Sequence, residues 1–182
     1  AFVNDQYELH TENPSLTDDT YIWRGVEGGF SDAVITSQVL QTVPTIDFVA
    51  CVFLRGDPLT DSGYGASISS WGNLHITKRT NGADNEILVS AMGLIAVPEN
   101  CWIKFAAIGD TLYAKAWENG DPEPASWDLQ TTDTDFQYGH AGILLSTGSS
   151  DLGYFILSQA AFDNVMVTSL TPSSERQALI DL

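Results

Sequence analysis

The sequence has few basic residues, only two cysteines and no long apolar run. Seven Lys and Arg residues stand against 24 Asp and Glu, which gives a formal net charge of −17 at pH 7. A surface this acidic repels nucleic-acid phosphates and anionic lipid headgroups. No apolar run approaches the roughly 20 residues that a membrane-spanning helix requires. The sequence therefore predicts neither nucleic-acid binding nor membrane insertion.

Both cysteines, Cys51 and Cys101, lie within short apolar runs. This setting predicts two buried thiols, and a disulfide stays the alternative if their strands are neighbours in an oxidising compartment. Neither cysteine has a His or a second Cys at the spacing of metal ligands, so a zinc site is not predicted. The opening Ala1-Phe2-Val3 shows no signal-peptide pattern, which leaves a removed methionine, a cleaved leader and a start within a longer protein all open.

A helical stripe of apolar residues is almost absent, and alternation with a period of two replaces it. In 111–118, Leu112, Ala114 and Ala116 alternate with larger or charged residues. The expected strands are Val34–Leu40, Thr45–Leu54, Gly65–Ser69, Asn73–Thr80, Glu86–Ala91, Cys101–Ile108, Thr111–Glu118, Trp127–Thr132, Ala141–Thr147, Tyr154–Ser158 and Phe162–Ser169. Many short strands at even spacing predict an all-β, two-sheet antiparallel β-sandwich over residues 1–170.

Turn residues and the C-terminal tail complete this outline. Asn81-Gly82 and Gly109-Asp110 stand between expected strands and favour tight hairpin turns. Residues 171–182 are expected to form a linker or a short terminal helix, because Ser174 and Gln177 have the spacing of a capping box.

Several segments resemble the concanavalin A-like lectin/glucanase (laminin-G-like) jelly-roll superfamily. The segments are Trp102–Phe105, Gly109–Trp117, Glu123–Trp127, Gly139–Leu145 and Ala161–Val167, with Val52–Arg55, Tyr64–Ala66 and Lys78–Gly82 upstream. The resemblance implies a concanavalin A-like jelly roll. It also implies a likeness to modules of secreted bacterial glycan-active proteins and of phage structural proteins. These are fold motifs, so they specify architecture better than activity.

Catalytic motifs of that superfamily are missing from the sequence. Its glycoside hydrolases carry a Glu-x-Asp-x-x-Glu strand or a close variant, and no such strand occurs here. Asp133 and Asp135 alternate, but they read as part of a solvated loop, and His75 reads as a strand-surface residue. The sequence therefore predicts a non-catalytic protein.

Sugars stack on exposed aromatic rings, so aromatic residues near turns are the candidate ligand contacts. Tyr64, Trp71 and Tyr138 are the residues that we expect to bind a glycan. The resemblance instead places Trp102, Trp117 and Trp127 at packing positions. No cofactor is required for such binding. A structural Ca²⁺ is expected to use Asp163, a hard oxygen donor, although no calcium-loop spacing is present.

The favoured interpretation is a non-catalytic, surface-exposed structural or adhesion module of a virion, such as a capsid decoration or a tail fibre. Its expected location is extracellular or on the virion surface, and its expected partners are neighbouring subunits and a glycan. A carbohydrate-binding module of a secreted bacterial protein is the alternative. A glycoside hydrolase or a polysaccharide lyase ranks below both.

Overall fold

The computed structural model describes residues 7–10, 22–41, 49–82, 86–96, 100–146 and 159–170 of the chain. Within these ranges, every regular element is a strand, as the alternating sequence predicted. No described helix is long and apolar enough to cross a membrane. The expected strand at 154–158 and the expected terminal helix lie outside the described residues.

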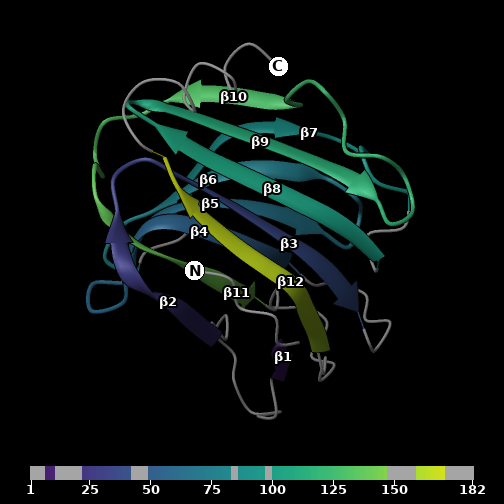
Figure 1. Cartoon of the computed structure of the whole chain (residues 1–182), viewed down its shortest axis with the longest axis horizontal. Helices are drawn as coiled ribbons and strands as arrows, with labels where there is room; N and C mark the ends of the chain where they lie inside the picture. Colours follow the sequence, from purple (N-terminus) through teal and green to yellow (C-terminus); the bar gives the residue numbers. More distant parts are fainter. Residues whose placement is uncertain are drawn as a thin grey trace.

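The strands form two six-stranded antiparallel sheets that face each other (Figure 1). The front sheet has the order β1 (Tyr7–His10), β12 (Gln159–Ser169), β3 (Ala33–Gln41), β8 (Asn100–Ile108), β9 (Thr111–Glu118) and β10 (Leu129–Thr132). The back sheet has the order β2 (Ile22–Phe30), β11 (Gly139–Ser146), β4 (Val49–Asp57), β5 (Ser62–Ser69), β6 (Leu74–Arg79) and β7 (Glu86–Ala91). The predicted two-sheet sandwich is thus confirmed.

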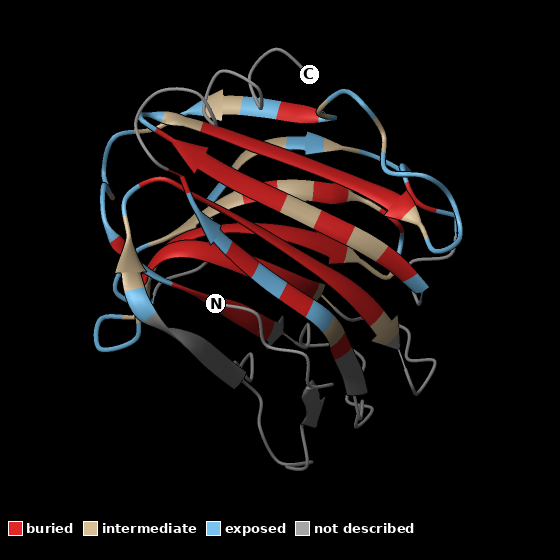
Figure 2. Ribbon diagram, viewed as in Figure 1, coloured by how far each residue is buried: buried red, intermediate tan, exposed pale blue. Residues whose placement is uncertain are grey.

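The core lies between the sheets. Strands β4, β5 and β9 are buried along most of their length (Figure 2). The members of the core are mostly aliphatic and phenyl side chains, among them Ile35, Val52, Leu54, Ile68, Ile76, Ile103, Phe105, Leu112 and Phe162. Cys51 and Cys101 are buried and form no disulfide with each other, as the apolar runs around them predicted. They belong to β4 and β8, which lie in different sheets.

The tight turn predicted at Gly109-Asp110 is confirmed, whereas the residues Asn81 and Gly82 lie in a wider connection than the predicted tight turn. β8 and β9 are joined by Gly109-Asp110, and of these two residues only Gly109 has a positive φ, as a type II′ turn requires. β6 and β7 pair across the connection 80–85, which includes Asn81 and Gly82, both at positive φ. This second connection fixes the end of β6 and therefore the position of Arg79.

One end of the sandwich is closed by a buried arginine. Arg55 is 2% exposed and has φ +55°, at a register shift between β4 and β5. Its guanidinium donates to the carbonyls of Ser31, Phe136 and Gly109 and to Asp32 Oδ1, over 2.6–3.2 Å. A single side chain thus connects the β2–β3 turn, the β8–β9 turn and the segment before β11.

Candidate ligand-binding groove

A groove runs along β5 on the outer face of the back sheet because β5 carries small residues there. Tyr64, Ala66 and Ile68 point into the core, so the alternate positions Gly63, Gly65 and Ser67 point outward. Larger side chains of the two neighbouring strands stand on either side of this small-residue row. The result is a small hollow that is partly open to solvent.

The pairing register sets the two walls of the groove. Phe53 of β4 and Thr77 of β6 lie on opposite sides of Gly65, and Arg79 lies opposite Gly63. The full lining consists of Val49, Cys51, Phe53, Asp61, Ser62, Gly63, Tyr64, Gly65, Ser67, Thr77, Arg79 and Leu144. The groove therefore combines an apolar side from β4 and β11 with a hydroxyl-bearing and charged side from β5 and β6.

Cys51, Phe53 and Leu144 form the apolar floor, a buried cluster of their own. A Cβ atom on Gly65 would lie 2.6 Å from Cys51 Sγ, so the absence of a side chain at this position gives the floor its depth. Burial raises the pKa of the Cys51 thiol to about 12. Cys51 is therefore a neutral thiol at pH 7 and contributes to packing rather than to nucleophilic chemistry.

The polar end of the groove is formed by an ion pair. Arg79 Nε lies 2.7 Å from Asp61 Oδ2, and the same guanidinium donates to the Gly82 carbonyl over 3.1 Å. The Gly82 amide donates back to the Asp61 carbonyl at 3.1 Å, and the Asn81 amide donates to Ser62 Oγ at 2.9 Å. The corner is therefore preorganised by the turn that follows β6.

This arrangement suits a ligand with both apolar and hydroxyl-rich faces. An apolar floor with a few fixed polar groups is typical of small-molecule sites. Of the described residues that line the groove, Asp61 is the only carboxylate, whereas glycoside hydrolysis uses two carboxyl groups across the scissile bond.

Tyr64 corrects one prediction. The sequence placed its ring on an exposed platform, but Tyr64 is 0% exposed and faces the core. Its hydroxyl donates to Asp133 Oδ1 at 2.5 Å and accepts from the Phe136 amide at 3.0 Å. Burial, followed by the bond to Asp133, raises the Tyr64 pKa to about 12. The ring is a core residue and cannot stack against a sugar.

Trp71 and Tyr138 are exposed, at 71% and 67%. Trp71 lies in the turn after β5, beyond Ser69, whereas Tyr138 immediately precedes β11, whose start pairs with the end of β4. Those two ends of the back sheet are separated by about 20 Å, at about 3.3 Å per residue of strand. The structure therefore does not bring these two predicted contacts together, and glycan binding by either stays a prediction.

Asp163 lies at a bulge of β12, where the register with β3 shifts and Asn164 has φ +53°. Its Oδ1 accepts from the Asn164 amide at 2.7 Å, and its carbonyl accepts from Ser37 Oγ at 3.2 Å. Within the described ranges, no group of three or more His, Cys, Asp or Glu residues could hold a metal ion. Calcium binding by Asp163 stays a prediction.

The acid–base candidates of the sequence lie outside the groove. Asp133 is 14% exposed rather than solvated as predicted, and it accepts from Tyr64 and from Lys78 Nζ at 2.8 Å. Burial opposes ionisation of Asp133, but these bonds outweigh it and lower its pKa. His75 faces outward from β6 but is half-buried, and burial lowers its pKa, so the imidazole is neutral at pH 7.

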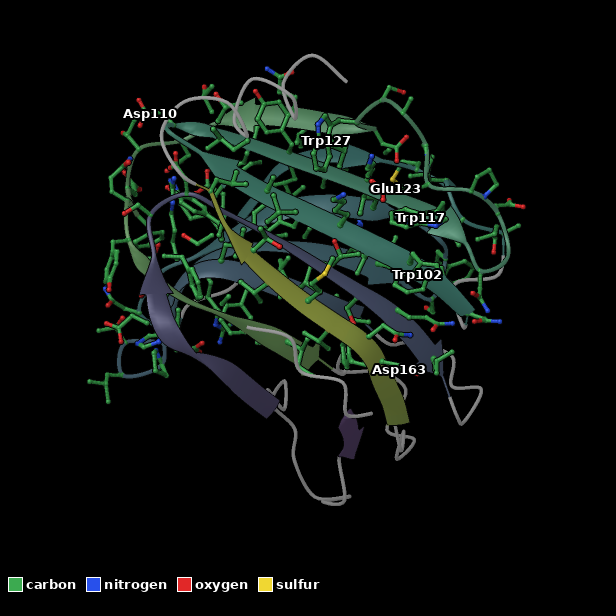
Figure 3. All side chains as sticks on the ribbon, in the orientation of Figure 1. Trp102, Asp110, Trp117, Glu123, Trp127 and Asp163 are labelled. Atoms are coloured by element: carbon green, nitrogen blue, oxygen red, sulfur yellow. The ribbon has the colours of Figure 1, made fainter. Side chains whose placement is uncertain are left out.

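The predicted packing tryptophans cover the outer face of the front sheet (Figure 3). Trp102 and Trp117 stack at 5.9 Å between ring centroids, with their planes 5° apart. Trp127 contacts Tyr113, and Lys115 Nζ lies 4.9 Å from the Trp127 ring. Their packing role is therefore seen directly.

Sequence reasoning missed Asp61, Arg79, Phe53 and Thr77 as a common site. The alternation of 62–69 contained the signal for the small outward row of β5. The walls were not visible, because they depend on which strands flank β5.

The sequence matches no protein-family model and no curated protein. Solved structures do resemble this fold. The carbohydrate-binding module CBM66 from Bacillus subtilis aligns at 20% identity with a TM-score of 0.64, covering 83% of this chain and 82% of that one. A β-glucanase from Bacillus licheniformis aligns at 13% identity and 0.58, covering 91% and 79%.

The exoplasmic/lumenal domain of VIP36, in a form bound to Ca²⁺ and Man3GlcNAc, aligns at 11% identity and a TM-score of 0.52, covering 94% of this chain and 87% of that one. Likenesses at this level of identity establish architecture, and activity has to be argued from the site. The fold is the concanavalin A-like jelly roll that the sequence segments suggested.

Proposed function

We propose that this protein is a non-catalytic saccharide-binding module and that the groove along β5 is its ligand site. The observation that supports this proposal most is the pairing of an apolar floor with hydroxyls and an ion pair on one outer sheet face. A pyranose presents C–H groups on one face and hydroxyls around its edge, so both surfaces find partners in such a groove. An extracellular location accompanies this proposal.

A groove-filling variant tests the proposal. Thr77→Trp places a large side chain between the walls, and it should abolish binding in a screen of immobilised glycans followed by calorimetry. Thr80→Trp is the matched control, because Thr80 is exposed, lies just after β6 and does not line the groove. Retained binding by the Thr77 variant, or no glycan bound by the wild-type protein, would contradict the proposal.

The same screen separates binding from hydrolysis. A glycoside hydrolase would release reducing ends from a bound glycan, and a lyase would release unsaturated products. We expect neither product after prolonged incubation with any glycan that the protein binds. Product formation would assign the site to an enzyme.

A structural or adhesion role within a virion is a second proposal. Trp71, Met92 and Leu94 are exposed on two turns that are joined by a hydrogen bond from the Ile95 amide to the Gly72 carbonyl. Exposed apolar side chains on turns joined in this way are typical of contact surfaces. The native mass tests this role: a particle component should purify as a large assembly, and a free module should purify as a monomer.

A further inference from the structure

We propose that the groove selects neutral saccharides over acidic ones, and that Asp61 sets this selectivity. The inference rests on the saccharide binding proposed above and adds the charge class of the ligand. It follows from how the charges at the polar end of the groove are paired.

Asp61 already holds the cation of the groove. Arg79 is the only basic residue among the described residues that line it, and its Nε lies 2.7 Å from Asp61 Oδ2. The neighbouring basic residue, Lys78, points to the opposite face of the sheet and contacts Asp133 at 2.8 Å. The groove therefore offers an acidic ligand no uncompensated positive charge from these residues.

The ion pair is also fixed in place. The Arg79 side chain is 12% exposed, and its second contact is the carbonyl of Gly82 at 3.1 Å. Gly82 in turn donates its amide to the Asp61 carbonyl. Rotating Arg79 toward a new carboxylate would break its hydrogen bonds to Asp61 and to Gly82, so the ion pair acts as one dipolar unit.

A neutral sugar and an acidic sugar meet this unit differently. Adjacent hydroxyls of a neutral sugar donate to the Asp61 carboxylate and accept from Arg79 without separating the pair. A uronic acid brings a second carboxylate close to Asp61, and like charges in a partly buried site repel strongly. The net charge of −17 adds a repulsion of longer range that salt screens.

Paired oligosaccharides test the selectivity. Oligomers of glucose, mannose and galactose are each compared with the uronic-acid oligomer of the same linkage, so the members of a pair differ only at C6 of each sugar unit. Calorimetry on the wild-type protein should show the neutral member of a bound pair binding at least about tenfold tighter, at low and at high NaCl. Persistence at high salt separates the local effect of Asp61 from the screened repulsion of the whole surface.

Asp61→Asn removes the charge with little change of shape and should reduce this ratio at least about tenfold by admitting the acidic member. Asp61→Glu retains the charge and should retain the rejection. Asp57→Asn is the matched control, because Asp57 precedes the same turn, is outside the groove and carries the same charge. In the wild-type protein, the Leu59 backbone amide donates to Asp57 Oδ1 at 2.9 Å. The side-chain oxygen of the asparagine in this control can still accept that hydrogen bond.

The outcomes are distinct. Wild-type binding of the acidic member as tightly as the neutral one overturns the selectivity and leaves saccharide binding standing. A ratio that falls equally in Asp57→Asn, or does not fall in Asp61→Asn, overturns the role of Asp61. Binding of no saccharide by the wild-type protein removes the proposed function and this inference together.

Discussion

At the scale of single residues, Arg55 carries an unusual share of the connections between distant segments. Its guanidinium contacts Asp32 and three carbonyls that belong to turns at one end of the sandwich. Burial lowers the Arg55 pKa and the neighbouring Asp32 charge opposes that effect. Because the guanidinium is buried, its net contribution to stability depends on the hydrogen bonds that it donates to the acceptors around it.

Arg55→Met should therefore destabilise the protein by about 3–5 kcal/mol, since it removes the cation that pairs with the buried Asp32 carboxylate. Urea unfolding followed by tryptophan fluorescence measures the change. Arg79→Met is the matched control: its ion pair with Asp61 is partly exposed, so the expected loss is at most about 1 kcal/mol. Equal losses of stability in the two variants would contradict a larger stabilising role for the buried Arg55 than for Arg79.

Tyr64 shows what residue-level interpretation of a sequence can and cannot do. Its Gly- and Ser-rich surroundings suggested an exposed platform or a strand pair, and Tyr64, Ala66 and Ile68 follow the period of two that defines one face of a strand. The periodicity was the correct signal. The partners of its hydroxyl, Asp133 and Phe136, were not predictable, because they are about 70 residues away along the chain.

At the scale of strands, β5 links packing to the depth of the groove. Gly65 is the position where a side chain would meet Cys51 Sγ at 2.6 Å and Thr77 Oγ1 at 3.3 Å. We expect Gly65→Ala to cost about 1–3 kcal/mol of stability, as overpacking does, and to weaken ligand binding. Adding Cys51→Ala should recover most of the stability, because it removes the nearest atom. Additive losses in the double variant would contradict this contact as the cause.

The loop between β9 and β10 folds back over the outer face of the front sheet through Glu123. Its Oε1 lies 2.8 Å from Lys104 Nζ and 2.8 Å from Lys115 Nζ, and Lys115 is 2% exposed. Lys115 also donates to the Pro124 carbonyl at 2.6 Å. Burial would raise the Glu123 pKa, but the bonds from both lysines outweigh it and lower the pKa.

Glu123→Gln should cost at most about 1 kcal/mol at pH 7, because the Glu123 side chain is 42% exposed and solvent screens its bonds to the two lysines. Because the pKa of Glu123 is lower in the folded protein than its ordinary value of about 4.5, ionised Glu123 contributes stability above pH 4.5. That contribution is lost as the pH falls through the folded-state pKa. The difference between wild type and variant should therefore shrink below pH 4.5 in urea unfolding. The control is Glu86→Gln. Glu86 is 63% exposed where it pairs with Lys78, so this substitution should have little effect.

Strand prediction succeeded where alternation was uninterrupted and failed where it was not. Among the described strands, β3 to β9, β11 and β12 overlap expected ranges, and β10 begins two residues later than predicted. β2 was missed because Gly25, Gly28 and Gly29 interrupt the alternation and lower β propensity. β1 was also missed, because its four residues are too few to show a clear period. The placing of β12 beside β3 and of β11 beside β4 depends on long-range pairing that no local period encodes.

At the scale of the whole molecule, the buried Cys51 thiol and Tyr64 hydroxyl make the stability depend on pH in the alkaline range. Burial raises the Cys51 pKa to about 12 from an ordinary value of 9.0, and burial also raises the Tyr64 pKa to about 12 from 10.0. Between the ordinary and the raised values, the unfolded chain releases these protons while the folded protein retains them. Stability from both groups is therefore complete below pH 9 and declines as pH rises toward 12.

Cys51→Ala isolates one of these protons. Each such group contributes a slope of up to about 1.4 kcal/mol per pH unit. The free energy of unfolding of the wild-type protein should therefore fall more steeply between pH 9 and pH 11 than that of Cys51→Ala, measured by urea unfolding under reducing conditions. Repulsion among the 24 acidic side chains is already complete at pH 7, so it shifts both proteins equally and does not alter the comparison. Parallel pH profiles would show that the thiol at the floor of the groove ionises without unfolding, and hence that water reaches it in the folded state.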